Sequence, residues 1–226
     1  MQSSTKKDSR PRGRPRAYDP QEALARARDT FWRNGYAGTS LDDLSEATGM
    51  NRPSLYGAFG DKRALYRQAI AAYRATARQK LAAALTDDVP LPEALGRVYA
   101  VALASYLEGA TAPRGCFMIG TAVTESVLDP AVRGDLAGGL REIDKAFEAR
   151  IRRARDAGEL AADADPTALG RIASAVLYFM AIRARAGESR AVLEATAQAG
   201  IALICGKPAK RKPSRKSLPR AQRGGG

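Results

Sequence analysis

The most constraining feature of this 226-residue sequence is one stretch, residues 39–66, which predicts two short helices joined by a tight turn. Ser40 is a suitable N-cap for the first helix, and Asp43, three positions later, completes the pattern of a capping box. Gly49 can adopt the positive φ that ends one helix before the next begins. Asn51 can cap the second helix. The stretch therefore predicts a helix-turn-helix.

The second of these helices predicts a surface that reads DNA. Leu55 and Phe59 are four residues apart and turn toward the core, which leaves the other side chains on the outer face. A short helix with hydrogen-bond donors and small residues at its N-terminal end is suited to a major groove. The side chains left off the core side are those of Asn51, Arg52, Ser54, Tyr56 and Ala58. We therefore expect double-stranded DNA as a partner.

The rest of the chain predicts an all-α fold with two domains. Alanine, leucine and arginine dominate, β-branched residues are sparse, and no segment alternates apolar and polar residues over strand length. Asp-Pro pairs, which favour helix starts, begin at positions 19, 129 and 165. We expect about nine helices: 20–34, the pair within 39–59, one from 61 toward Leu81, and then 92–110, 116–127, 130–157, 166–186 and 189–205.

A loop with two prolines at 87–92 marks the predicted domain boundary. We expect an N-terminal three-helix helix-turn-helix domain over residues 19–82 and a second helical domain over 83–205. Residues 1–18 and 206–226 are predicted to be a disordered basic arm and a disordered basic tail.

The two tails carry the whole net charge of +13. Residues 1–18 hold six Lys and Arg against one acid, residues 206–226 hold eight with no acid, and residues 19–205 are neutral. Such tails typically bind phosphates without sequence preference and with strong salt dependence. The alternative is that they only aid solubility.

Several chemistries are disfavoured by composition. The chain has no histidine and only two cysteines, 89 positions apart, so we expect no metal site, no disulfide and a reducing cytoplasm. No nucleophile elbow or acid–base carboxylate pair is present, so we expect no enzyme activity and no cofactor. The N-terminus has no apolar signal region, and the apolar run 173–182 is shorter than a membrane span, so we expect no membrane partner.

Over residues 18–75 the sequence resembles the TetR/AcrR family of bacterial transcriptional regulators. The resemblance is carried by FWRNGY, TSLDDLSEATGM and NRPSLYGAFGDKRALYRQAI, and most specifically by Leu55, Tyr56, Phe59 and Lys62. It implies a cytoplasmic homodimer, nucleoid-associated when bound, that represses transcription from a palindromic operator. One recognition helix from each subunit would enter successive major grooves.

The resemblance also implies roles for individual residues. Asn51, Arg52, Pro53, Ser54, Gly57 and Ala58 would face bases or the groove floor, Tyr56 and Lys62 would contact phosphates, and Thr39 would contact the DNA backbone. Arg52 is the best candidate for direct readout, because a guanidinium can bind O6 and N7 of guanine, with a phosphate contact as the alternative. Arg14 and Arg16 lie in a segment that resembles a minor-groove hook, with loose phosphate contact as the alternative.

In this family the second domain binds a small-molecule effector that releases the DNA. The candidate effector-binding residues are Tyr99, Leu103, Tyr106, Phe117, Met118, Phe147, Tyr178 and Met180, with Arg183 or Glu125 as a polar anchor. The alternative is that the apolar set is plain core and the polar pair makes surface salt links. Small residues on the last two helices favour close packing in a dimer interface.

Cys116 offers a different form of regulation. It follows Arg114 and Gly115 at a predicted helix N-terminus, where the dipole and the arginine would lower the pKa of the thiol. Some TetR-like regulators resembling this segment sense electrophiles or oxidants with a thiol here. The alternatives are a buried, inert Cys116 or, for the whole protein, non-specific DNA packaging.

Overall fold

The structure, a computed structural model, describes residues 18–109 and 112–206, and in these residues it contains nine α-helices, one π-helical turn and no strand. The all-α prediction is confirmed. The helices are α1 (Pro20–Asn34), α2 (Leu41–Thr48), α3 (Arg52–Phe59), α4 (Lys62–Ala84), α5 (Leu91–Leu107), α6 (Val123–Glu125), α7 (Pro130–Asp156), α8 (Pro166–Arg185) and α9 (Arg190–Cys205), and the π-helical turn is η1 (Met118–Ala122). The predicted basic arm, including Arg14 and Arg16, and the predicted basic tail lie outside the described residues, apart from Tyr18 and Gly206.

Short polar side chains begin most of the helices. Asp19, Asn51, Asp61, Asp129 and Asp165 each accept a hydrogen bond from a backbone N–H in the first turn of the helix that follows. Each such bond satisfies a donor that the helix itself cannot pair. Helix α2 begins with the predicted capping box: the Asp43 amide donates to Ser40 Oγ (3.0 Å) and the Ser40 amide to Asp43 Oδ2 (2.7 Å).

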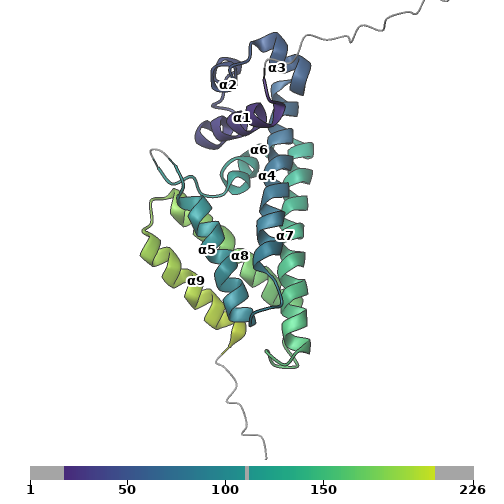
Figure 1. Cartoon of the computed structure of the whole chain (residues 1–226), viewed down its shortest axis with the longest axis vertical. Helices are drawn as coiled ribbons and strands as arrows, with labels where there is room; N and C mark the ends of the chain where they lie inside the picture. Colours follow the sequence, from purple (N-terminus) through teal and green to yellow (C-terminus); the bar gives the residue numbers. More distant parts are fainter. Residues whose placement is uncertain (1–17, 110–111, 207–226) are drawn as a thin grey trace, which may run out of the picture.

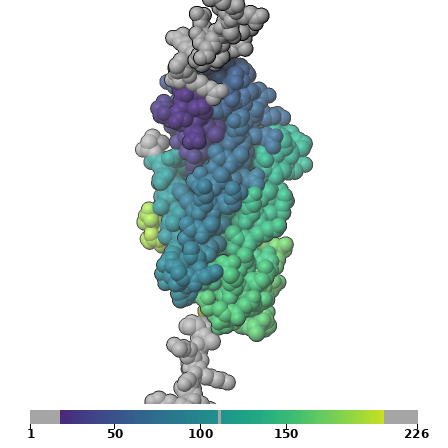
Figure 2. All heavy atoms as spheres, turned by 45° about the vertical axis from the view of Figure 1, so that its right-hand side comes forward, coloured from purple at the N-terminus to yellow at the C-terminus, as the bar shows by residue number. Residues whose placement is uncertain are grey.

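Helices α1, α2 and α3 form one end of an elongated body (Figures 1 and 2). Their apolar faces meet around Phe31, Leu44, Leu55 and Phe59, all of which are buried. Between α2 and α3 the chain turns at Gly49, whose φ of 69° lies in the left-handed region that glycine favours. This geometry is the predicted helix-turn-helix.

Helix α4 connects this end to the rest of the molecule. Its 23 residues span about 35 Å, and α7 lies alongside it (Figure 1). Helices α5, α8 and α9 complete the second bundle, in which α8 packs against both α7 and α9. By length and composition α8 could cross a membrane, but here one face of it, including Ala173, Leu177 and Met180, is buried against the neighbouring helices.

The prediction of one continuous helix over residues 116–127 is wrong. The chain instead makes the π-helical turn η1 and then the single turn of α6. One feature favours the irregularity: the Thr121 hydroxyl donates to the carbonyl of Phe117 (2.8 Å). A side chain that binds the backbone one turn back often distorts a helix.

Candidate DNA-binding surface and interior cavity

Helix α3 presents a polar outer face. Asn51 caps it by accepting from the Ser54 amide (2.9 Å), and Leu55 and Phe59 anchor its inner face in the core. The exposed residues are Asn51, Arg52, Pro53, Ser54, Tyr56 and Gly57. Ala58 differs from the expectation, because it is half-buried and packs against the core.

Arg52 is held by a carboxylate on the preceding helix. Its Nε and Nη2 donate to Asp42 Oδ1 (3.1 and 2.7 Å), and Nη2 also donates to Asp42 Oδ2 (2.7 Å). Both side chains remain more than half exposed. The hydrogen bonds that Arg52 donates to Asp42 raise the pKa of the guanidinium, so the arginine is charged at neutral pH.

Lys62 and Thr39, two further residues predicted to contact DNA, lie in different surroundings. Lys62 begins α4, with its Nζ 4.4 Å from the centroid of the Tyr36 ring, and partial burial lowers the pKa of the ammonium. Thr39 is 1% exposed, and its hydroxyl donates to the carbonyl of Gly35 (2.6 Å). The side chain of Thr39 therefore faces inward, and the contact of this residue with the DNA backbone stays a prediction.

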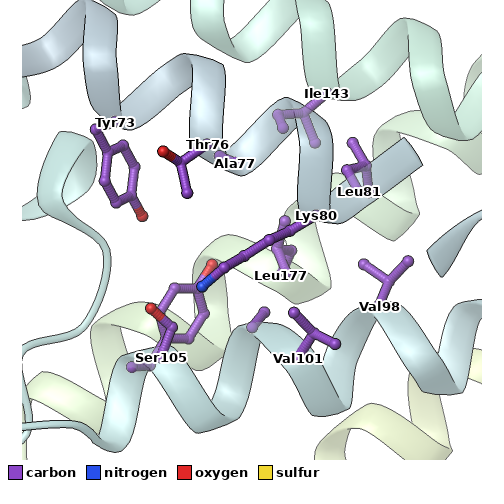
Figure 3. A pocket seen from close by; sticks show the side chains of 12 residues that line it. Tyr73, Thr76, Ala77, Lys80, Leu81, Val98, Val101, Ser105, Ile143 and Leu177 are labelled. Atoms are coloured by element: carbon purple, nitrogen blue, oxygen red, sulfur yellow. The ribbon is translucent and has the colours of Figure 1, made fainter. Parts of the chain in front are cut away.

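A cavity of about 340 Å³ lies in the second domain. Its walls come from α4, α5, η1, α7 and α8, together with the segment that leads into η1. Apolar residues dominate them, among them Leu81, Met118, Ile143 and Leu177. A smaller cavity of about 90 Å³ between α4 and α5 shares part of this wall, and Lys80 extends from α4 across it toward Ser105 (Figure 3).

Three tyrosines and one cysteine supply uncharged polar groups to the wall of the large cavity. The Tyr73 hydroxyl donates to Sγ of Cys116 (3.3 Å), while the buried Tyr178 hydroxyl has no partner among the described residues. Tyr106 is the third tyrosine. Burial raises the pKa of all three phenols and of the thiol, so these groups are neutral at pH 7.

The expected low pKa of Cys116 is wrong in direction. The thiol is 8% exposed, and the cost of placing a thiolate in a buried site outweighs the hydrogen bonds that favour one. Arg114, expected to stabilise the thiolate, instead pairs with Asp29 (3.3 Å) and lies over the Trp32 ring.

The predicted effector-binding residues fall into three places. Tyr106, Met118 and Tyr178 line the large cavity. Tyr99 and Leu103 line a separate groove of about 100 Å³ beside α9. Away from these spaces, Phe117, Phe147 and Met180 are fully buried core, Glu125 is half-buried, and Arg183 is exposed and paired with Glu188 (3.2 Å).

Sequence reasoning missed the contribution of α4 to the cavity. Tyr73, Arg74, Ala77 and Leu81 line it, yet residues 19–82 were assigned to the DNA-binding domain. The available signal was the length of α4, which is greater than a three-helix domain needs.

In residues 18–109 and 112–206, no group of three or more Cys, Asp or Glu side chains is arranged to hold a metal ion.

Several polar contacts join α1 and the first half of α4 to the neighbouring part of the second bundle. The Tyr66 hydroxyl lies 2.8 Å from Oγ1 of Thr121 in η1, and the Trp32 indole donates to the carbonyl of Arg114 (3.1 Å). Arg63 also pairs with Asp129 (3.2 Å). Helix α1 also packs directly against η1, whose Met118 lines the cavity.

The molecule combines a helix-turn-helix, whose second helix has an exposed polar face, with a helical domain that contains a cavity. This combination is typical of DNA-binding regulators. Residues 23–69 match the family described as bacterial regulatory proteins, tetR family. Residues 92–199 match the tetracyclin repressor-like C-terminal domain.

Individual relatives agree with this assignment. The repressor ComR of Escherichia coli is 34% identical over 192 residues, which cover 82% of this chain and 89% of ComR. A cysteine mutant of the TetR family regulator CifR, solved with 26-bp operator DNA, is 34% identical with a TM-score of 0.76, covering 83% of this chain and 98% of that one. A TetR family regulator from Cytophaga hutchinsonii is 25% identical with a TM-score of 0.74, covering 85% and 96%.

The chain belongs to the TetR family, and it is a DNA-binding transcriptional repressor rather than an enzyme.

Proposed function

We propose that this repressor acts as a homodimer on a palindromic operator and is released when a small molecule enters the large cavity. The observation that carries the proposal is that η1 and α4 line the cavity and also pack against the helix-turn-helix end, η1 against α1 and α4 against α1 and α3. An occupant that displaces either element changes the position of α3. Residues 19–82 would bind DNA in the nucleoid, with the second half of α4 also forming one wall of the effector site, and residues 83–205 would form the rest of that site and bind the second subunit.

The proposed dimer interface is formed by α8 and α9. These helices carry large apolar side chains on the surface, namely Ile172, Phe179, Ile182, Val192 and Leu203. Exposed apolar residues in such numbers commonly mark an interface. Pairing α8 and α9 of two subunits would make a four-helix bundle, and a two-fold dimer matches a palindromic site.

The cavity favours an uncharged, mostly apolar effector with a hydrogen-bonding group. Its phenols and its thiol are neutral at pH 7, and the buried hydroxyl of Tyr178 has no hydrogen-bond partner among the described residues. Charged side chains such as Arg74 and Glu142 also line the cavity, but they pair with each other (2.5 Å). A volume of about 340 Å³ is at the lower end of the range, roughly 300 to 1,000 Å³, that is usual for small-molecule sites.

Footprinting on genomic fragments tests the proposal. We expect a protected palindrome at moderate salt, with compounds from a library of neutral apolar molecules abolishing the protection. Ala146→Leu, which adds three carbon atoms to the cavity wall, should weaken that response about tenfold or more while leaving protection intact. Titration of each active compound against the footprint measures the change.

Ala83→Leu is the matched control, because Ala83 is exposed on α4 and lies outside the cavity wall. If both variants respond like the wild type, the cavity is not the effector site. If coverage of DNA is uniform and is abolished by salt, the packaging alternative replaces the repressor.

A thiol-switched repressor is the second candidate, because Cys116 lines the same cavity and accepts a hydrogen bond from Tyr73. Its raised pKa leaves less thiolate at pH 7 than a free cysteine has. Alkylation of Cys116 by N-ethylmaleimide should therefore be slow at pH 7 and should accelerate by about tenfold per pH unit until the pKa is reached. Mass spectrometry of the labelled peptide against time and pH measures this rate.

The release assay decides whether this reactivity regulates DNA binding. A neutral electrophile should release the wild type and Cys205→Ser from the operator but not Cys116→Ser. Release of Cys116→Ser under the same challenge would rule out the switch. Cys205 is the matched comparison, because burial raises its pKa to about 11 and it lies outside the cavity.

A further inference from the structure

Asp42 makes no capping hydrogen bond to its own helix. It lies in the first turn of α2, beside Asp43, but Asp43 alone makes the reciprocal capping box with Ser40. The Asp42 side chain is 75% exposed and directs both carboxylate oxygens to Arg52 on the recognition helix. An exposed ion pair of this kind contributes little to folding.

The geometry of the pair leaves part of the guanidinium open. Asp42 accepts from Nε and Nη2 of Arg52, so it occupies the side edge of the planar group. The Nη1 end makes no hydrogen bond within the described residues and remains directed away from the carboxylate. A bidentate contact to O6 and N7 of guanine requires two N–H groups in a fixed orientation, which the terminal edge can supply.

We propose that Asp42 is a specificity-determining positioning residue: its carboxylate fixes Arg52 so that the terminal edge of the guanidinium reads a guanine. This inference rests on the proposed reading of an operator by α3. A free arginine side chain has many rotamers and can also contact phosphates of any sequence. Fixing it before binding reduces the ordering cost and disfavours the unspecific contact.

The negative charge of Asp42 is compatible with DNA binding because Arg52 neutralises it. A lone carboxylate next to a DNA-binding helix would repel phosphates, whereas the ion pair with Arg52 is locally neutral. Replacing Asp42 by asparagine therefore has two opposite effects. Loss of the negative charge strengthens binding to every DNA sequence, and loss of the fixed orientation weakens discrimination at a single base pair.

The experiment compares base preference rather than affinity alone. The probe is the duplex that the full-length wild-type protein selects from a randomised DNA pool, together with duplexes in which each base pair is changed in turn. The base pair at which Arg52→Ala loses its preference identifies the position that Arg52 reads. At that position Asp42→Asn should reduce the preference for guanine about fivefold, and the base preferences at other positions should be unchanged.

Glu46→Gln is the matched control, because it removes one exposed carboxylate from the same helix, one turn further along. It should keep the full preference. In the Arg52→Ala background, Asp42→Asn should cause no further loss, as expected for a residue that acts through Arg52. Asp42→Glu, which keeps the carboxylate, should retain more of the preference than Asp42→Asn.

Other outcomes overturn the inference in distinguishable ways. If Asp42→Asn binds more tightly with its guanine preference unchanged, Asp42 only competes with DNA for Arg52. If Arg52→Ala alters no base preference, Arg52 is not a reader and Asp42 has nothing to position, although an operator still exists. If the wild type selects no sequence at all, the proposed operator binding itself fails.

Discussion

Replacing Arg150 by methionine should lower the free energy of unfolding by about 3 to 5 kcal/mol. The arginine side chain is 2% exposed, and it donates from Nε to the carbonyl of Thr86 (3.1 Å) and from Nη2 to that of Val89 (2.8 Å). The carboxylates of Asp87 (3.3 Å) and Glu159 (3.5 Å) balance its charge. Methionine fills much of the volume but leaves these acceptors without a donor.

Arg152→Met is the matched control for this prediction. Arg152 lies two residues further along α7, is half exposed and pairs with Glu148 one turn away, so its loss should cost less than about 1 kcal/mol. Urea denaturation followed by circular dichroism measures both variants. Midpoints for the two variants that agree within experimental error would contradict the role assigned to Arg150.

Replacing Ile182 by glutamate should separate the proposed dimer and reduce operator affinity by about 100-fold or more. Ile182 is 55% exposed on α8, near Phe179 in the proposed interface, where a buried unpaired carboxylate would be costly. A monomer binds one half-site and loses the gain of about 10² to 10⁴ that linking two binding units provides. Sedimentation velocity measures the mass, and a gel-shift titration measures the affinity.

Leu128→Glu is the matched control for the dimer. Leu128 is 84% exposed in the turn between α6 and α7, so the same charge is introduced away from α8 and α9. It should remain dimeric and bind the operator like the wild type. A dimeric Ile182→Glu protein would place the interface elsewhere.

Local signals in the sequence predicted most helix starts correctly. The capping residues Asp19, Asn51, Asp129 and Asp165 act within the first turn of their own helices, so their effect does not depend on the rest of the fold. The helix-turn-helix was predictable for the same reason, because capping and the positive φ of Gly49 are local properties.

The remaining features depend on partners far away in the chain. Cys116 is buried by the packing of several helices and accepts a hydrogen bond from Tyr73, 43 residues earlier, so its environment could not be inferred from Arg114 alone. Arg150 is likewise satisfied by distant partners, because the loop before α5 supplies the carbonyls that accept its hydrogen bonds. The roles of the exposed residues on α3 in binding DNA stay predictions.

The continuity of α4 has a practical consequence for hybrid regulators. Lys62 at its first turn lies beside the helix-turn-helix, and Leu81 near its last turn lines the cavity, so one rigid helix belongs to both parts. A chimera joined at residue 82 would combine the α4 of one parent with the cavity walls of the other. Exchanging DNA specificity between relatives should therefore use a junction before α4, at Gly60 or Asp61, so that each cavity keeps its own wall.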